Sequence, residues 1–232
     1  FDFELSRSFF RLEKEPLLII IRLGIPQLVR SLFVRFSMLW VNANVNSYGL
    51  VVSATNSVGN KIQKFAEVFI QGVDTASAAM IGQNLGAKQY DRAKNVVWAT
   101  VSSCLICAAV AAVLCLIEPK AVFGIFTKDP EVLDFGVVYL RIMVIHFFAS
   151  ALTGSFQAMV TGSGFVSLGF AIGILDGVVC RIGFSLLFLH VFHQGAVSYF
   201  WGTALSRTLP AVICFAYFIS GKWRTRKLLS DE

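Results

Sequence analysis

Charged residues are scarce in this sequence. They make up 15% of its 232 residues, whereas a soluble domain of this size is about a quarter charged. Hydrophobic residues account for 56% of the chain, and the mean hydropathy is +0.70. Proline is also rare, with 5 residues, while phenylalanine is abundant, with 22. This composition excludes an ordinary soluble domain, because such a domain could not hide so much apolar surface.

Two segments lack charge altogether. No charged residue occurs in 95–117 or in 142–175, and the second run is divided only by the small, polar TGSG at 161–164. A bilayer core requires about 20 apolar residues per helix. We therefore interpret these runs as membrane spans rather than as buried helices of a soluble protein.

Motifs for catalysis and for metal binding are also missing. The sequence contains no H-E-x-x-H, no P-loop and no G-x-S-x-G, each of which serves a known chemistry. The three histidines and five cysteines do not form a metal constellation by spacing. Cys104 and Cys107 form a C-x-x-C without a strand–helix context, so we expect them to be packing residues. The sequence therefore predicts neither an enzyme nor a metal site.

Polar breaks divide the chain into six predicted transmembrane helices. They cover residues 16–45, 51–86, 91–117, 131–160, 165–191 and 196–221. A lead-in of mixed charge, 1–15, and a basic tail, 222–232, flank this membrane unit of 16–221. We expect the lead-in to follow a longer amino-terminal sequence.

Lysine and arginine are unevenly distributed between the two ends of the predicted bundle. The lead-in, the 86–94 turn and the tail are basic and fall on one side of a six-span zigzag. On the other side, the loops at 44–49 and 193–195 have no Lys or Arg. The positive-inside rule thus predicts that both termini are cytoplasmic. We attribute the net charge of +6 to this orientation in a lipid bilayer, and we expect no nucleic-acid partner.

Polar residues follow one face of the second predicted span. They recur at steps of 3 or 4 residues, which keeps them on one side of a helix. The members are Asn56, Asn60, Lys64, Glu67, Gln71 and Asp74. Such residues usually face the bundle interior or a wet cavity. We expect Lys64 and Glu67 to neutralise each other, whereas Asp74 has no basic neighbour one turn away.

Two further spans carry similar stripes. The members are Gln27, Ser31, Arg35 and Asn42 in the first span, and His146, Ser150, Thr153, Gln157 and Thr161 in the fourth. Three stripes on separate spans predict a shared water-filled cavity, with dry interhelical hydrogen bonding as the alternative. Asp176 and Arg181 also lie within a span. Being five residues apart, they point about 140° away from each other on an α-helix and are not expected to pair.

The segment IGQNLGAKQYDRAK, residues 81–94, resembles the Gly-Gln-Asn-x-Gly-Ala … Arg-Ala/Val-Lys signature of the multidrug and toxic-compound extrusion (MATE) family of antiporters. The matching residues are Gly82, Gln83, Asn84, Gly86, Ala87 and Arg92. Further similarity lies in NKIQKFAEVFIQG upstream, in RLGIPQLV in the first span, and in VYLRI and TGSG downstream.

This resemblance implies both a fold and a function. Family members have twelve helices in two six-helix lobes around a central cavity, and this chain is similar to the C-terminal lobe. We therefore expect an all-α integral membrane fold of six transmembrane helices, with a missing N-terminal six-helix lobe as its partner. The implied function is secondary antiport at the plasma (inner) membrane. A small organic, often cationic, substrate would be exported in exchange for Na⁺ or H⁺, with no other cofactor.

The resemblance also implies where the site lies. The expected cavity residues are Arg35, Asn42, Asn60, Lys64, Glu67, Gln71, Asp74, His146, Gln157 and Asp176. The basic turn after the second span is the expected hinge. There Gly86 would occupy a tight or left-handed turn, and Gln83 and Asn84 would cap freed carbonyls.

One region departs from the family pattern. Some Na⁺-coupled members carry an acidic residue in the middle of the first span of this lobe, where this sequence has Arg30 and Arg35. The remaining acidic candidates are Glu67, Asp74 and Asp176. Asp74 is the first choice for coupling or substrate binding, because no neighbour on its own helix pairs with it. Alternatively, Asp74 pairs with a basic residue of another helix and is structural.

Two other functions are left open by the sequence. A lipid-linked oligosaccharide flippase of the same superfamily is one, because Arg30, Arg35, Lys61 and Lys64 would suit an anionic pyrophosphate. The other is a non-transport role, as an intramembrane enzyme or a membrane scaffold. The lack of a paired nucleophile and base argues against the enzyme.

Overall fold

The computed structural model describes residues 14–225, apart from the side chains of 15, 16, 19, 20, 22, 23 and 26. The predicted lead-in and tail therefore lie largely outside the described residues. Within them every regular element is helical. In chain order these are α1 (Lys14–Asn46), α2 (Leu50–Gly86), α3 (Tyr90–Ile117), α4 (Pro119–Gly124), α5 (Pro130–Gly162), α6 (Val166–Ile174), the π-helical turn η2 (Leu175–Cys180), α7 (Arg181–His190), α8 (Val197–Leu205), α9 (Thr208–Ser220) and the 3₁₀ turn η3 (Lys222–Arg224).

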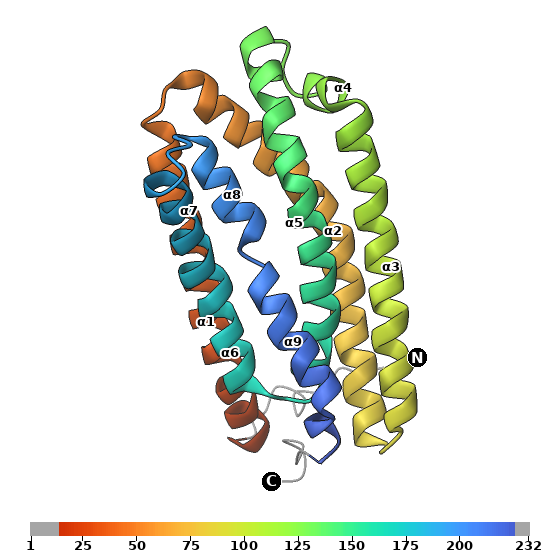
Figure 1. Ribbon diagram of the computed structural model, residues 1–232. Helices are drawn as coiled ribbons and strands as arrows, with labels where there is room; N and C mark the ends of the chain where they lie inside the picture. Colours follow the sequence, from red (N-terminus) through yellow and green to blue (C-terminus); the bar gives the residue numbers. More distant parts are fainter. Residues whose placement is uncertain (1–13, 226–232) are drawn as a thin grey trace, which may run out of the picture.

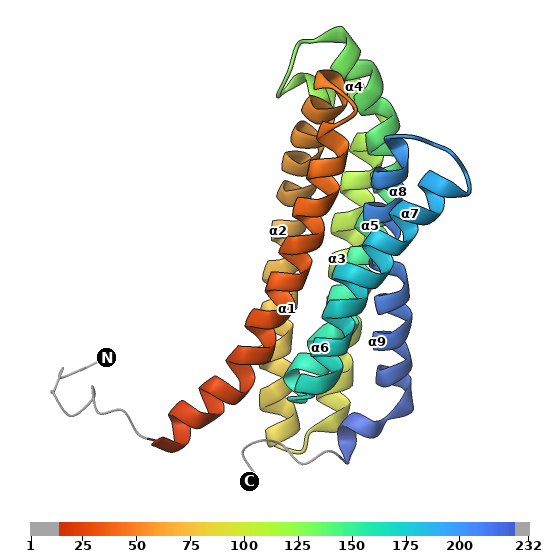
Figure 2. The same cartoon turned by 90° about the vertical axis from the view of Figure 1, so that its left-hand side faces the viewer.

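The long helices form a bundle with α5 at its centre (Figures 1 and 2). α5 packs against α2 and α3 on one side and against α8 and α9 on the other, while α1 packs mainly against α6 and η2. Buried apolar side chains along α5 form one cluster toward its Pro130 end, around Tyr139, and another toward its Gly162 end, around Met159. The helix order agrees with the six predicted spans, because the fifth corresponds to α6–η2–α7 and the sixth to α8–α9.

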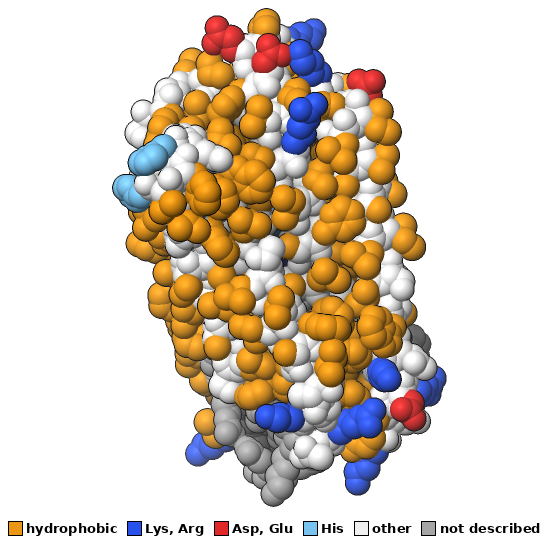
Figure 3. Space-filling view, viewed as in Figure 1, with side chains coloured by type: hydrophobic (Ala, Val, Ile, Leu, Met, Phe, Trp, Pro, Cys, Tyr) orange, Lys and Arg blue, Asp and Glu red, His pale blue; other side chains and the backbone are white. Residues whose placement is uncertain are grey.

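The outer surface is suited to a bilayer. In the described part of the chain, four segments are long and apolar enough to cross a membrane, namely α3, α5, Val166–His190 and Val197–Ser220. α1 and α2 have 33 and 37 residues but carry charged residues and are not among the four. On the face drawn in Figure 3, apolar side chains cover the middle of the bundle and charged side chains gather at its two ends. The all-α membrane fold is thus confirmed.

The last two spans are interrupted near their middles. η2 replaces α-helix in the fifth span, and the sixth breaks between α8 and α9, at Ser206 and Arg207. Small residues let α1 approach α6 and η2. A Cβ on Gly177 of η2 would lie 3.0 Å from the Val34 Cα, and one on Gly173 of α6 would collide with the Arg30 side chain. π-Helical turns inside α-helices occur frequently at functional sites. The level of the bundle at which η2 and the α8–α9 break lie is therefore a candidate functional site.

The turn after α2 differs from its predicted form. Gly86 ends α2 without a positive φ, and the left-handed residue of the turn is Lys88, at φ 56°. The expectation of a left-handed Gly86 is thus wrong. Asn84 does bond to a carbonyl, because its side-chain amide donates to the Met80 main-chain oxygen at 2.7 Å. Arg92 donates to the Gln89 side chain at 3.0 Å.

Substitutions in this turn should therefore act at Lys88 rather than at Gly86. A Cβ at Gly86 would meet nothing within 4 Å, so Gly86→Ala should leave the thermal midpoint of the full-length protein unchanged. Lys88→Gly should stabilise the protein by about 1 kcal/mol, because glycine adopts positive φ without the Cβ penalty. Lys88→Val should destabilise it. Thermal unfolding in detergent tests all three, and a larger loss for Gly86→Ala than for Lys88→Val would contradict this assignment.

Candidate functional site

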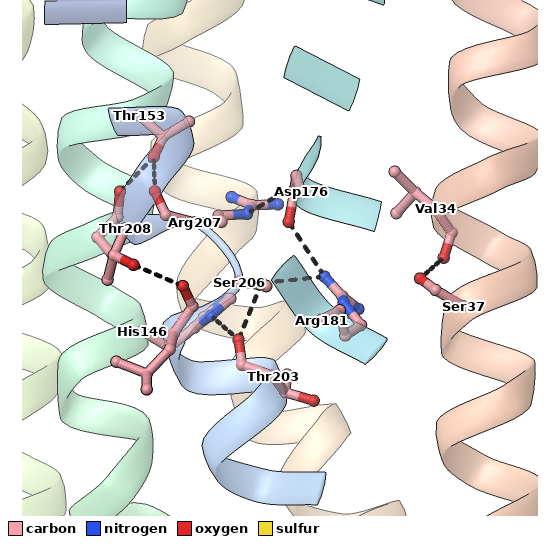
Figure 4. Close-up of polar contacts among 12 residues, drawn as sticks. Val34, Ser37, His146, Thr153, Asp176, Arg181, Thr203, Ser206, Arg207 and Thr208 are labelled. Atoms are coloured by element: carbon pink, nitrogen blue, oxygen red, sulfur yellow. Dashed lines mark hydrogen bonds and ion pairs between the residues drawn. The ribbon is translucent and has the colours of Figure 1, made fainter. Parts of the chain in front are cut away.

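A cluster of ionisable side chains, four of them buried and Arg207 partly buried, lies where the interrupted spans meet α2 and α5. Figure 4 shows His146, Asp176, Arg181 and Arg207 of this cluster. Its members, called the central cluster below, are Glu67, His146, Asp176, Arg181 and Arg207. His146 stands at the middle of α5 (Pro130–Gly162), which sets the depth of the whole cluster. Ionisable groups at such depth are costly and usually functional.

Glu67 is held by partners on other helices. The exposed fraction of this residue is 6%. Its Oε1 lies 2.8 Å from His146 Nε2 and 3.6 Å from Arg207 Nη2. Lys64, the expected partner, is exposed and forms no ion pair with Glu67. That expectation was wrong because α2 turns Glu67 toward α5 and the α8–α9 break, while Lys64 lies about 60° further around the helix.

Both ring nitrogens of His146 face hydrogen-bond partners. Nδ1 lies 3.0 Å from the main-chain oxygen of Thr203. A carbonyl oxygen can only accept, so Nδ1 must carry a hydrogen. Nε2 then faces Glu67 Oε1 at 2.8 Å, a contact that is a hydrogen bond only when a proton lies between the two atoms. Without it, a ring lone pair would face a carboxylate. Gln63, whose amide nitrogen lies 2.9 Å from Nε2, is the other donor within reach.

Asp176 and Arg181 form an ion pair, contrary to the prediction. Arg181 Nη2 lies 3.5 Å from Asp176 Oδ1, and both residues are buried, with exposed fractions of 1% and 6% respectively. The prediction assumed α-helical geometry, in which residues five apart diverge. η2 is instead π-helical, and its i→i+5 pattern brings such residues closer to one face. Arg207 Nε lies 3.7 Å from the other oxygen of Asp176, so one guanidinium links Asp176 to Glu67.

The helix break between α8 and α9 is bonded to α5 at two points. His146 bonds to the Thr203 carbonyl before the break, and Thr153 Oγ1 donates to the carbonyl of Arg207, within the break, at 2.9 Å. Ser206, within the break, donates to the Thr203 oxygen at 3.0 Å. The bonds to the Thr203 carbonyl supply donors beside the break, as a lipid-embedded backbone requires, whereas the Arg207 carbonyl also accepts from the Ala211 main-chain nitrogen at 3.0 Å.

The other predicted cavity residues do not join the central cluster. Asn42 accepts a hydrogen bond from Asn56 at 2.8 Å, across α1 and α2. Asp74 lies half-buried against Gly154 of α5, and the Cys104 thiol donates to it at 3.6 Å. Within the described residues Asp74 has no ion pair. Two of the remaining members are partly buried, Asn60 and Gln157. The other three are exposed, namely Arg35, Lys64 and Gln71.

Sequence reasoning missed the central role of Arg207 and Gln63. Arg207 interrupts an apolar run and stands three residues before Pro210, a pattern that favours a broken helix. That signal was available. Gln63 lies one residue off the regular stripe on α2, so periodicity alone gave no reason to include it.

Comparisons with known proteins place these observations in context. The family model MatE matches residues 26–187. The protein named "Probable multidrug resistance protein YoeA" of Bacillus subtilis is 25% identical over 65% of this chain and 32% of its own length. Multidrug export protein MepA of Staphylococcus saprophyticus is 22% identical over 90% of this chain and 45% of its own. The chain thus spans half or less of the length of these relatives.

Solved structures share the fold. A crystal structure of MATE in the bent conformation superposes with a TM-score of 0.85 at 17% identity, over 96% of this chain and 50% of that one. A MOP superfamily transporter from Pyrococcus furiosus, described as having a binding pocket of reverse polarity, superposes with a TM-score of 0.84 at 18% identity, over 94% of this chain and 49% of that one. In both, the match covers half of the solved chain.

Proposed function

Because this chain belongs to the MatE family, we propose that it forms the carboxyl-terminal half of a secondary antiporter that exports small organic compounds. The relatives named above as multidrug proteins support this proposal, and so does the match to half of each solved chain. The proposed partner is an amino-terminal six-helix lobe. We place the protein in the plasma membrane with both termini in the cytoplasm, in agreement with the uneven distribution of Lys and Arg.

We propose H⁺ as the coupling ion, held between Glu67 and His146. The observation that carries this is the 2.8 Å contact between the carboxylate and Nε2, combined with the Nδ1 bond to the Thr203 carbonyl. A Na⁺ ion at Glu67 would meet the guanidinium of Arg207, 3.6 Å away, and like charges repel strongly in a poorly solvated site. A proton shared by Glu67 and His146 can be bound without moving the Arg207 guanidinium.

Loss of the proton would change the contacts at the helix break. The Nε2 lone pair would face the carboxylate, and the Gln63 amide could donate to it instead. The surrounding charges are Arg207, Asp176 and Arg181, which already pair with one another. The hydrogen bond from His146 Nδ1 to the Thr203 carbonyl links the imidazole to the α8–α9 break. A change in the protonation of His146 or Glu67 would therefore alter the contacts of the break. Coupling requires that proton and substrate favour different states of such a two-state element.

The test uses the full-length protein in proteoliposomes that contain carboxyfluorescein or ethidium. An imposed pH gradient should drive export of at least one dye, and a Na⁺ gradient at equal pH should not. Glu67→Gln and His146→Gln should each lower the pH-driven rate at least about tenfold, equivalent to about 1.4 kcal/mol.

Two further variants serve as controls. Glu118→Gln removes an exposed carboxylate beyond α3 and should leave the rate unchanged. Asp74→Asn tests the carboxylate preferred from the sequence, and we expect a smaller effect than for Glu67→Gln. Export driven by Na⁺, or full activity of both Glu67→Gln and His146→Gln, would contradict H⁺ coupling at this pair.

A further inference from the structure

One face of α2 is directed toward α1 and carries exposed basic side chains. Two hydrogen bonds identify the sides of α1 and α2 that face each other. Ser53 Oγ donates to the Asn46 side chain at 2.6 Å, and the Asn56 side-chain amide donates to the Asn42 side chain at 2.8 Å. Steps of four residues continue this side of α2 from Asn56 through Asn60 to Lys64.

The matching side of α1 is also polar and basic. Steps of about 3.5 residues continue it from Asn42 back to Arg35 and Ser31. α1 and α2 are joined by a short turn and diverge toward the other end of the bundle, as both ribbon views show (Figures 1 and 2). Arg35, Ser31 and Lys64 are therefore exposed. We call the surface formed by Ser31, Arg35, Asn60, Lys61, Lys64 and Gln71 the α1–α2 face.

Lys64 lies deep in the predicted membrane. Lys64 is three residues from Glu67, about 4.5 Å along the helix axis, and Glu67 contacts His146 at the middle of α5. Half of the hydrocarbon core is about 15 Å thick, so the side chain of Lys64 cannot reach the headgroups by extending along the helix. A lysine in this position is therefore expected to serve a polar, functional surface.

The charge of the α1–α2 face has one sign. Its ionisable members are Arg35, Lys61 and Lys64, and within residues 14–225 none of them forms an ion pair. The acidic groups at this depth are already engaged. Glu67 is bound to His146 and Arg207, and Asp176 is bound to two arginines.

The third carboxylate of this region also points elsewhere. The carboxylate of Asp74 rests against Gly154 of α5 and accepts from Cys104 of α3. It therefore lies on the side of α2 that contacts α3 and α5. No exposed carboxylate of the described chain balances the three cations on the α1–α2 face.

We propose that the exported compound carries an anionic group, a carboxylate, sulfonate or phosphate, which binds between Lys64 and Arg35. This rests on the proposed function and replaces the cationic substrate expected from the sequence. Arginine offers a planar pair of donors to such an oxyanion, and lysine adds a second charge-assisted bond. The same chemistry could come from a soluble organic anion or from an anionic lipid headgroup.

A binding experiment tests the charge without requiring transport. Carboxyfluorescein is titrated with the purified full-length protein, and its anisotropy is measured. Lys64→Gln and Arg35→Gln should each weaken binding about tenfold, and Lys64→Arg should restore most of it. Lys128→Gln, which removes an exposed lysine from the α4–α5 loop, should bind like the parent protein. Tighter binding of ethidium than of carboxyfluorescein, or unchanged affinity in both Gln variants, would overturn the proposal.

A transport experiment then separates the two sources of the anion. One set of proteoliposomes contains carboxyfluorescein, and another contains fluorescent NBD-phosphatidylglycerol, whose outer-leaflet fraction is read by dithionite quenching. Loss of carboxyfluorescein export in Lys64→Gln supports a soluble anion, and loss of lipid movement supports a headgroup. Export of ethidium but of neither anion overturns the anionic assignment while leaving antiport intact. If nothing is transported but carboxyfluorescein binding depends on Lys64, the proposed antiport fails and the anion site stands.

Discussion

Replacing Arg207 with leucine is expected to destabilise the full-length protein by about 3–5 kcal/mol, the usual effect of removing one partner of a buried ion pair. Arg207 lies 3.6 Å from Glu67 and 3.7 Å from Asp176. Without it, Glu67 keeps His146 as its only ionisable partner among the described residues, and Asp176 keeps Arg181. The loss would appear as a lower thermal midpoint in detergent, with faster proteolysis.

Two further variants distinguish this effect from a general loss of positive charge. Arg141→Leu removes an exposed arginine from α5 and should change stability by less than about 0.5 kcal/mol. The double variant Arg207→Leu/Asp176→Asn should recover part of the loss, because the neutral amide no longer needs a second cation. Equal stability of Arg207→Leu and Arg141→Leu would show that the central cluster does not stabilise the fold.

Replacing Gly202 with leucine should also be severe. Gly202 of α8 is buried against α7, and a Cβ there would collide with Ser185 Oγ and lie 2.7 Å from the Arg181 carbonyl oxygen. Backbone atoms cannot move aside as flexible side chains do. α7 and α8 would have to separate, at a cost of about 3 kcal/mol or more. Close helix contacts through small residues are typical of membrane bundles.

The control lies on the same helix pair. A Cβ on Gly183 of α7 would meet nothing within 4 Å, so Gly183→Leu should fold normally. Both variants are compared by the yield of monodisperse full-length protein and by its thermal midpoint. A Gly202→Leu protein as stable as Gly183→Leu would mean that α7 and α8 are not closely packed in the membrane.

Hydropathy and periodicity were sufficient to predict the fold. The predicted spans 91–117 and 131–160 match α3 and α5 almost to the residue, since a bilayer allows few alternatives for long apolar segments. The stripe on α2 correctly placed Glu67 and Asn56 on buried surface. However, the stripe divides in the structure, because Lys64 and Gln71 lie on the side exposed near α1. Periodicity states which residues share a face but not which neighbour that face meets.

Irregular helix geometry accounts for the main failure in the site. Arg181 and Asp176 were judged unable to pair because an α-helix was assumed, and η2 changes that angle. The sequence of η2, LDGVVC, carries no recognised signal for a π turn. The partners of Arg207 depend on how α2, η2 and the α8–α9 break converge, which is tertiary information and is not encoded in local spacing.

The sign of the exposed charges on the α1–α2 face has an electrical consequence. Exchange of one organic cation for one proton would move no net charge across the membrane. Exchange of a monovalent anion outward for one proton inward moves two elementary charges, both in the direction favoured by a negative interior. Each charge gains about 2.3 kcal/mol per 100 mV, so the exchange would gain about 4.6 kcal/mol per 100 mV. Lys64 and Arg35 would thus make export depend on the membrane voltage as well as on the proton gradient.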